Sequence, residues 1–259
     1  MRMAANPLRT FSVDSLSVSV YSGADAMGEA AAELAIRAID EAIARRGVAN
    51  LILATGNSQL AFLRQLRQAS VEWPAVNVFH MDEYLGLKPG HRAGFPRFLR
   101  EHIVGHVPIG AFYPVPSRPA DVEMACRGYE LLLRAHPADL CVLGVGENGH
   151  LAFNDPPFAD FADPAWVKVV ALAERSRVQQ VGEGHFDTLA DVPTHAITLT
   201  IPALRSARQM ICLAPERRKA VPVRDALEGP VSTTCPASIL RETLHARLFL
   251  DTDSASLLR

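Results

Sequence analysis

Apolar and polar positions alternate along this chain with two different periods. Leu16 to Tyr21 alternates residue by residue, which predicts a strand with one buried face. Residues 22–25 resemble a capping box and predict the start of a helix that runs to about Arg46. Its apolar stripe consists of Ala32, Ile36, Ile39 and Ile43. Similar short runs predict further strands at 51–54, 76–80, 167–172, 196–199, 209–214 and 246–250, and one that begins at Leu140.

This alternation of strands and helical segments with short links predicts the fold class. It favours an α/β fold with a single doubly wound, mainly parallel sheet that carries helices on both faces, a Rossmann-like arrangement. No linker or internal repeat divides the sequence. Residues 1–259 are therefore expected to form a single domain with its core at about 16–250.

Composition and charge narrow the class of partner. Apolar residues make up 49% and charged residues 21% of the chain, as in ordinary globular proteins. The net charge is -2 and no basic cluster is present, so we expect no nucleic acid and no membrane partner. Small molecules are the expected partners, and the oligomeric state, including a homo-oligomer, stays open.

The cysteines and the first residues indicate a compartment. The four cysteines are far apart and form no Cys-x-x-Cys pair, which is typical of reduced thiols and of neither a disulfide framework nor a zinc site. The chain starts without an apolar segment of signal-peptide length, and no later segment is long enough to span a bilayer. A cytoplasmic location is therefore expected.

The stretch from Leu140 to Pro157 carries the clearest candidate chemistry. A buried strand ends there in a loop that contains Gly144, Gly146 and Gly149 and presents His150. Ligands of open α/β sheets bind beyond the carboxyl ends of the strands, so a histidine near a carboxylate there is a plausible acid/base centre. The alternative is a structural turn. The glycine spacing also matches a dinucleotide fingerprint, but the two prolines that follow prevent a long helix. The polar candidates in this loop are Asn148, His150, Asn154 and Asp155.

A second candidate site is a turn between a predicted strand and helix. Thr55, Gly56, Asn57 and Ser58 would offer hydroxyls and backbone N–H groups to an anion such as phosphate, although such turns often serve only to cap a helix. Lys219 follows another strand at a predicted helix start, where a bound anion would offset its unfavourable position. Its neighbours Arg217 and Arg218 are interpreted as a solvated basic face.

Two carboxylates follow the strand at 76–80. Asp82 and Glu83 are candidates for a general base, and the apolar neighbours Met81 and Tyr84 would raise the pKa of Asp82 by limiting its hydration. The alternative is a solvated turn. His102 and His106 are interpreted as surface residues because no third metal ligand is apparent. Finally, the polar segment 175–184 is expected to form a mobile cover with glycine hinges.

Four blocks of this sequence together resemble a known family. They are Thr55–Ser58, Phe79–Leu87, Gly144–Asn154 and Val192–Leu199, and in content and order they are similar to glucosamine-6-phosphate deaminases, also called isomerases. The resemblance implies conversion of an amino sugar 6-phosphate, glucosamine 6-phosphate, and water to fructose 6-phosphate and ammonia, with no metal and no organic cofactor.

The resemblance also implies roles for individual residues. His150 would move the proton that opens the sugar ring, and Asp82 would move a proton from C2 to C1. Asp155 would orient His150, and the turn at 55–58 with Lys219 would hold the phosphate. Glu83, Gly146 and Asn154 are further candidates.

The chain departs from the family pattern at three places. Some members have Asp at position 148 and Glu at position 155, where this chain has Asn148 and Asp155. Where some members carry a phosphate-binding arginine, this chain has the stretch 179–182, so its phosphate site is expected to be weaker or built differently.

Two alternative functions stay open on the sequence. One is a 6-phosphogluconolactonase, a sister class with a similar glycine loop. In that class the residues after the histidine typically differ from Leu151-Ala152-Phe153-Asn154 of this chain. The other is a non-catalytic sugar-phosphate sensor. It is disfavoured because the residues before the first strand are too few for a helix-turn-helix.

Overall fold

A computed structural model of the protein describes residues 5–88, 90–156 and 158–259. Residues 1–4 and Pro157, which belong to segments considered above, lie outside the described residues. The strands of the larger sheet are β1 (Arg9–Val13), β2 (Leu16–Tyr21), β3 (Ala49–Leu53), β4 (Val76–His80), β6 (Ala111–Tyr113), β7 (Leu140–Gly144), β10 (Gln209–Ala214) and β11 (Ala246–Asp251). The strands expected at 16–21, 51–54, 76–80, 209–214 and 246–250, and the one beginning at Leu140, are thus present.

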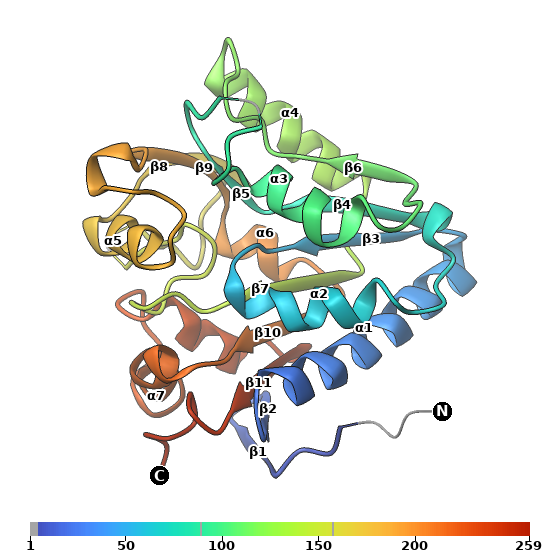
Figure 1. The fold of residues 1–259 in the computed structure, drawn as a ribbon, viewed down its shortest axis with the longest axis vertical. Coiled ribbons are helices and arrows are strands. Elements are labelled where there is room, and N and C mark those ends of the chain that lie inside the picture. Colours follow the sequence, from blue (N-terminus) through green and yellow to red (C-terminus); the bar gives the residue numbers. More distant parts are fainter. Residues whose placement is uncertain (1–4, 89, 157) are drawn as a thin grey trace.

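The larger sheet is mainly parallel. Among the described residues, eight strands pair in the order β1-β2-β11-β10-β7-β3-β4-β6 (Figure 1). All neighbours run parallel except β1 and β2. The chain passes from β3 to β4 on one side and from β7 to β10 on the other, so the strand order reverses between β3 and β7. Such a reversal opens a crevice at the carboxyl ends of the strands.

Helices cover both faces of this sheet. Alternate residues of β3 point into the two opposite layers of the core: Leu51 and Leu53 belong to one apolar cluster and Ile52 to the other. The first cluster includes residues of α1 (Ala24–Arg46), α2 (Leu60–Leu66) and α3 (Phe95–Leu99), and the second those of α4 (Val122–Ala135), α6 (Ile201–Arg205) and α7 (Ala220–Glu228). The predicted α/β class with helices on both faces is confirmed.

Helix α1 forms over the expected range, but not by the expected cap. Ala32 and Ile39 of its apolar stripe are fully packed against the sheet. The capping-box prediction is wrong, because the N-cap residue is Gly23 and no side chain caps the helix. At the other end Gly47 has a left-handed φ of 73°, and its N–H donates to the carbonyl oxygen of Ile43.

The expectation of a single sheet needs correction. The strands β5 (Asp82–Tyr84), β8 (Val167–Ala171) and β9 (His195–Leu199) form a separate antiparallel sheet in the order β5-β9-β8. It packs on its own apolar cluster, which includes Tyr84, Phe95, Phe153 and Phe186. An apolar run has the same appearance in either sheet, so only the packing of these aromatic rings distinguishes them. Helix α5 (Glu174–Gly182) follows β8 and lies beside this smaller sheet (Figure 1).

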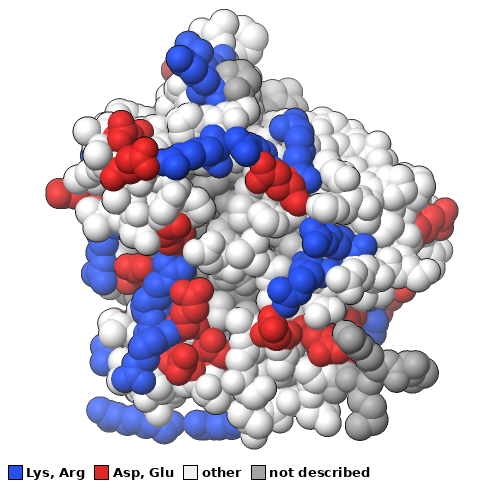
Figure 2. All heavy atoms as spheres, in the orientation of Figure 1, with Lys and Arg blue, Asp and Glu red and all other residues white. Residues whose placement is uncertain are grey.

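Three further features can be compared with the sequence-based expectations. None of the helices in the described ranges is both long and apolar enough to cross a membrane. On the face shown in Figure 2, Lys and Arg side chains are interspersed with Asp and Glu. All four cysteines are buried and unpaired, as expected.

Candidate active site

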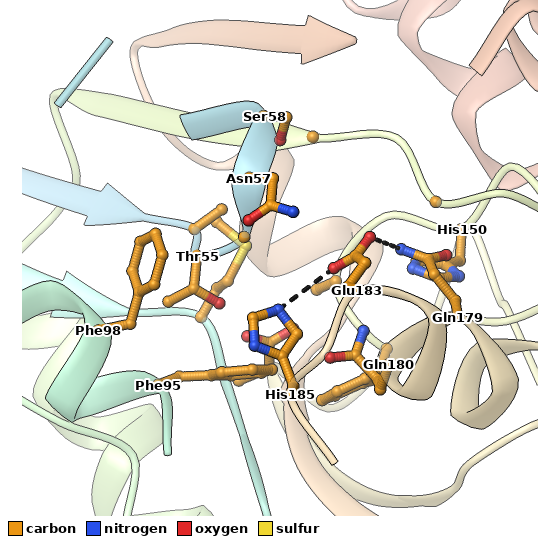
Figure 3. Close-up of a pocket in the computed structure, with 18 of the residues that line it drawn as sticks. Thr55, Asn57, Ser58, Phe95, Phe98, His150, Gln179, Gln180, Glu183 and His185 are labelled. Carbon is orange, nitrogen blue, oxygen red and sulfur yellow. Dashed lines mark hydrogen bonds and ion pairs between the residues drawn. The ribbon is translucent and has the colours of Figure 1, made fainter. Parts of the chain in front are cut away.

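The carboxyl ends of four neighbouring strands surround one cleft. The segments that follow β3, β4, β7 and β10 supply the turn Thr55–Ser58, Asp82, the glycine loop with His150, and Lys219. Together with helix α5 they line one open cleft (Figure 3). The parallel register of the central strands therefore brings together site residues that are far apart in the sequence.

One side of the His150 ring is held by a network of hydrogen bonds. Nδ1 of His150 lies 2.7 Å from Oδ1 of Asn148 and 3.2 Å from Oδ1 of Asp155. The amide of Asn148 donates through Nδ2 to Asp155 at 2.8 Å, which leaves its Oδ1 as an acceptor for the ring. The proton is therefore assigned to Nδ1, and Nε2 is left as an acceptor.

Asp155 lies at the base of this network. It is fully buried, and its Oδ1 also accepts a hydrogen bond from the hydroxyl of Ser176 on α5. Burial alone would raise the pKa of Asp155. The hydrogen bond and positive charge of His150, together with hydrogen bonds from Asn148 and Ser176, instead lower this pKa to about 2. Asp155 thus stays ionised beside the imidazole. Ser176 had no signal in the sequence, because it stands alone in a polar segment.

The imidazole of His150 packs directly against Gly146. A Cβ built on Gly146 would lie 2.2 Å from Cε1 and Nε2 of His150, far inside van der Waals contact. Only glycine leaves room for the ring here. Asn154, in contrast, is buried away from the cleft and donates to the carbonyl oxygens of Leu151 and Leu199. Its geometry is that of a structural link between the glycine loop and β9, so the structure does not bring Asn154 into the site.

Asp82 and Glu83 point in different directions because successive residues of a strand alternate. Asp82 lines the cleft, and burial raises its pKa to about 7. The neighbouring Glu83 instead accepts hydrogen bonds from the backbone N–H groups of Tyr84 and Phe95, at 2.7 and 3.1 Å. Glu83 is therefore not in the cleft. Burial, the largest cause, and the charge of Asp82 raise the pKa of Glu83 to about 8.

The turn and the lysine that the sequence predicts to bind an anion both line the cleft. Gly56 has a left-handed φ of 98°, which lets the chain turn sharply from β3 into the residues Asn57–Gln59. Lys219 belongs to the short helix η5 (Arg217–Lys219) and is only 4% exposed. Burial, followed by the charge of Arg218, lowers its pKa. The expectation that Arg218 belongs to a solvated basic face is wrong, because it also lines this cleft and is paired with carboxylates.

The polar segment expected to cover the site does line the cleft. It forms most of α5 and the turn after it, and contributes Gln179, Gln180 and Glu183; the next residue, His185, lines the cleft too (Figure 3). Nε2 of His185 lies 3.3 Å from Glu183, and Gln179 donates to Glu183 at 2.8 Å. Its mobility stays a prediction. The sequence pattern had not singled out Glu183 and His185 individually, and it gave no signal for the further lining residues Arg92, Phe95 and Phe98.

No metal site is apparent within the described parts of the chain, where no three His, Cys, Asp or Glu side chains cluster. Instead, two titratable side chains, His150 and Asp82, share a cleft at the carboxyl edge of a doubly wound sheet. The molecule is thus an α/β protein with a small-molecule site suited to acid/base chemistry.

Comparison with known proteins identifies the family. Residues 22–249 match the family described as glucosamine-6-phosphate isomerases/6-phosphogluconolactonase, and the chain belongs to it. A glucosamine-6-phosphate deaminase of Exiguobacterium sibiricum is 38% identical over 208 residues, which are 80% of each chain. One from Bacillus cytotoxicus is 33% identical over 231 residues, covering 88% of this chain and 86% of the relative.

Solved structures agree with this assignment. A monomeric glucosamine-6-phosphate deaminase superposes with a TM-score of 0.85 at 27% identity, over 93% of this chain and 99% of the other. A 6-phosphogluconolactonase from Shewanella baltica superposes with a TM-score of 0.75 at 20% identity, over 93% and 100% of the two chains. The second likeness is one of fold. The family resemblance drawn from the four sequence blocks is therefore confirmed.

Proposed function

We propose that this protein converts glucosamine 6-phosphate and water to fructose 6-phosphate and ammonia. Its curated relatives with 38% and 33% identity are glucosamine-6-phosphate deaminases. The observation that carries the proposal is that Asp82 and His150 line the same cleft as the turn Thr55–Ser58 and Lys219. One sugar phosphate bound in this cleft can meet both the acid/base groups and the anion site.

The first step in this proposal is ring opening by His150. Its Nδ1 proton is engaged by Asn148, so Nε2 accepts the proton of the sugar's anomeric hydroxyl and returns a proton to the ring oxygen. The ionised Asp155 stabilises the imidazolium that forms in between. Asn148 holds the ring by hydrogen bonds but brings no charge, which leaves Asp155 as the carboxylate beside the imidazole.

Asp82 carries out the second step. Its carboxylate takes the C2 proton of the open chain and delivers it to C1, while one proton of the C2 ammonium passes to the aldehyde oxygen, so that the amino aldose becomes a C2 iminium with a hydroxyl at C1. Water then adds to C2 and ammonia leaves, which gives the ketose phosphate. A pKa near 7 suits both halves of this transfer, because the same group has to accept and then donate a proton.

The phosphate is proposed to lie at the turn formed by Thr55, Gly56, Asn57 and Ser58, with Lys219 as counter-charge. The turn offers hydroxyl and backbone N–H donors, and Lys219 is a buried cation that lines the same cleft. No organic cofactor or metal is required for this chemistry, since it consists of proton transfers, addition of water and loss of ammonia. We also propose that the chain functions as a single domain in the cytoplasm, where its four buried thiols stay reduced.

Ammonia release tests the proposal. Purified protein is incubated with glucosamine 6-phosphate, galactosamine 6-phosphate or 6-phosphogluconolactone, and ammonia or acid formation is followed beside an Asp82→Asn control. Ammonia from the gluco compound supports the proposal, and ammonia from the galacto compound alone changes the substrate. Lactone hydrolysis alone would assign the protein to the sister class. Binding of sugar phosphates without any turnover would favour a sensor.

A further inference from the structure

Two neighbouring cations of η5 face the cleft. Lys219 is almost fully buried, while the side chain of Arg218 is 27% exposed, and both line the cleft. The exposed Arg217 precedes them on the same short helix. Only one of these three basic residues, Lys219, has so far been given a role in binding.

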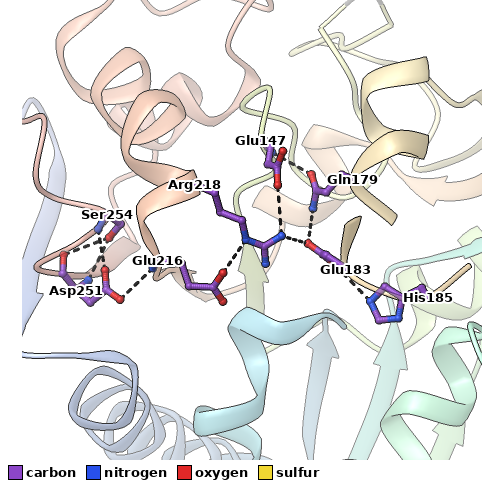
Figure 4. A network of polar contacts seen from close by, with 8 residues as sticks. All are labelled: Glu147, Gln179, Glu183, His185, Glu216, Arg218, Asp251 and Ser254. Carbon is purple, nitrogen blue, oxygen red and sulfur yellow. Dashed lines mark hydrogen bonds and ion pairs between the residues drawn. The ribbon is translucent and has the colours of Figure 1, made fainter. Parts of the chain in front are cut away.

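Arg218 is fixed by carboxylates from three separate segments (Figure 4). Its Nε donates to Oε2 of Glu216 at 2.6 Å, and its Nη1 pairs with Glu183 at the end of α5 and with Glu147 of the glycine loop, the latter at 3.3 Å. Glu183 is the most enclosed of these carboxylates, with a side chain 7% exposed. The guanidinium is therefore held in one orientation at the wall of the cleft.

Part of the guanidinium has no partner within the described chain. A guanidinium carries five N–H groups. The contacts of Arg218 use Nε and Nη1, and its Nη2 donates to no acceptor among the described residues. A purely structural ion-pair network does not need a residue that lines the cleft and leaves one donor nitrogen unused. The two N–H groups of Nη2 are free to donate to phosphate oxygens.

We propose that Arg218 binds the substrate's phosphate group through Nη2, beside Lys219. The inference rests on the proposed function for naming the phosphate as the anion. Glu183 connects the cover helix α5 to this arginine. The chain would thus supply its second phosphate cation from η5.

Lys219 carries the positive charge that no described side chain balances at this end of the cleft. Arg218 lies beside it and is paired with Glu183, Glu147 and Glu216. Lys219 has no carboxylate within ion-pair distance in the described part of the chain, so a phosphate would be its first counter-ion.

Binding of inorganic phosphate by calorimetry, together with the kinetics of glucosamine 6-phosphate, tests the inference. We expect Arg218→Gln to weaken phosphate binding and to raise KM for glucosamine 6-phosphate by roughly 10- to 100-fold, the usual effect of losing a charge-assisted hydrogen bond. Arg217→Gln removes an equal charge from the same helix without facing the cleft and is expected to change neither quantity. Arg218→Lys keeps the cation among the carboxylates but loses the Nη2 donors, and is expected to weaken binding as well.

The variant Glu183→Gln distinguishes two possible roles of Arg218: a ligand of the phosphate, or a residue that only holds α5 in place. If Arg218 touches the phosphate, this variant binds phosphate as tightly as the unmodified protein or more tightly, because a negative charge leaves the cleft while the arginine remains. If Arg218 only holds α5 in place, both Glu183→Gln and Arg218→Gln weaken binding to a similar degree, which would overturn the inference. Unchanged phosphate binding by the folded Arg218→Gln and Arg218→Lys variants would overturn it too.

The two proposals can fail separately. Absence of ammonia release with phosphate binding that still depends on Arg218 would refute the deaminase function and support the role of Arg218. Ammonia release with a KM that Arg218→Gln leaves unchanged would support the deaminase function and refute the role of Arg218.

Discussion

Replacing Asp82 with Asn should make this protein more stable and much less active. The carboxylate of Asp82 is 7% exposed, lines the cleft and makes no hydrogen bond through its side chain to the described residues. Burial raises its pKa from 3.8 to about 7. The carboxylate is thus ionised at neutral pH only at a cost to the folded state. Asparagine has nearly the same shape and never carries that charge.

The magnitude follows from the pKa difference. One pKa unit corresponds to about 1.4 kcal/mol, so the difference between 3.8 and about 7 corresponds to about 4 kcal/mol. Between these two pH values the folded state binds the proton and the unfolded state has lost it. Stability contributed by the protonated group is therefore fully present below about pH 4 and is lost as the pH rises to about 7. The charge of Asp82 also raises the pKa of Glu83, so its removal acts in the same direction.

Urea unfolding of both proteins at several pH values measures this effect. Trp73 is buried and can report unfolding by its fluorescence. We expect the Asn variant to be more stable by less than about 2 kcal/mol at pH 5 and by about 4 kcal/mol at pH 8. Its turnover should fall by roughly 100- to 10,000-fold, the usual contribution of a positioned acid/base group. The turnover of the unmodified enzyme should rise with pH and level off above about 7, as Asp82 becomes the ionised base.

Two results would refute this reasoning. A stability difference that does not change with pH would show that the Asp82 carboxylate is not held in its neutral form by burial. An Asn variant with normal turnover would remove Asp82 from the mechanism, whatever its stability.

Three further variants test the rest of the site. Lys219→Ala should raise KM for glucosamine 6-phosphate with little change in kcat, and an unchanged KM would place the phosphate elsewhere. Gly146→Ala should reduce turnover by at least roughly 100-fold, because the new Cβ would lie 2.2 Å from the His150 ring; Gly182→Ala, with open space around its Cβ, is the matched control and should stay active. Asp155→Asn should lower kcat at least roughly tenfold between pH 6 and 8 without a new titration, since a carboxyl with a pKa of about 2 is ionised throughout; normal kcat would mean that His150 needs no carboxylate.

Local patterns determined much of the fold and of the site. The strands, helix α1 and the glycine loop could be predicted because side-chain period and glycine content act over a few neighbouring residues. For the same reason the turn at 55–58, Asp82, His150 and Lys219 could be singled out as candidates. In a parallel sheet the carboxyl ends of the strands meet at one edge, so their convergence in one cleft followed from the predicted topology.

Only the tertiary structure decided which of two adjacent, chemically similar residues faces the cleft. Asp82 faces the cleft while Glu83 caps α3 at Phe95, although both are carboxylates at the end of a strand. Arg218 was expected to be solvated, yet it pairs with Glu183, which lies 35 residues earlier in the chain. The small antiparallel sheet likewise depends on rings that come from three distant segments. The period of apolar residues in a sequence shows which face of a single segment is buried. The direction in which a particular side chain points, and its ion-pair partner, depend on packing between segments that are remote in sequence.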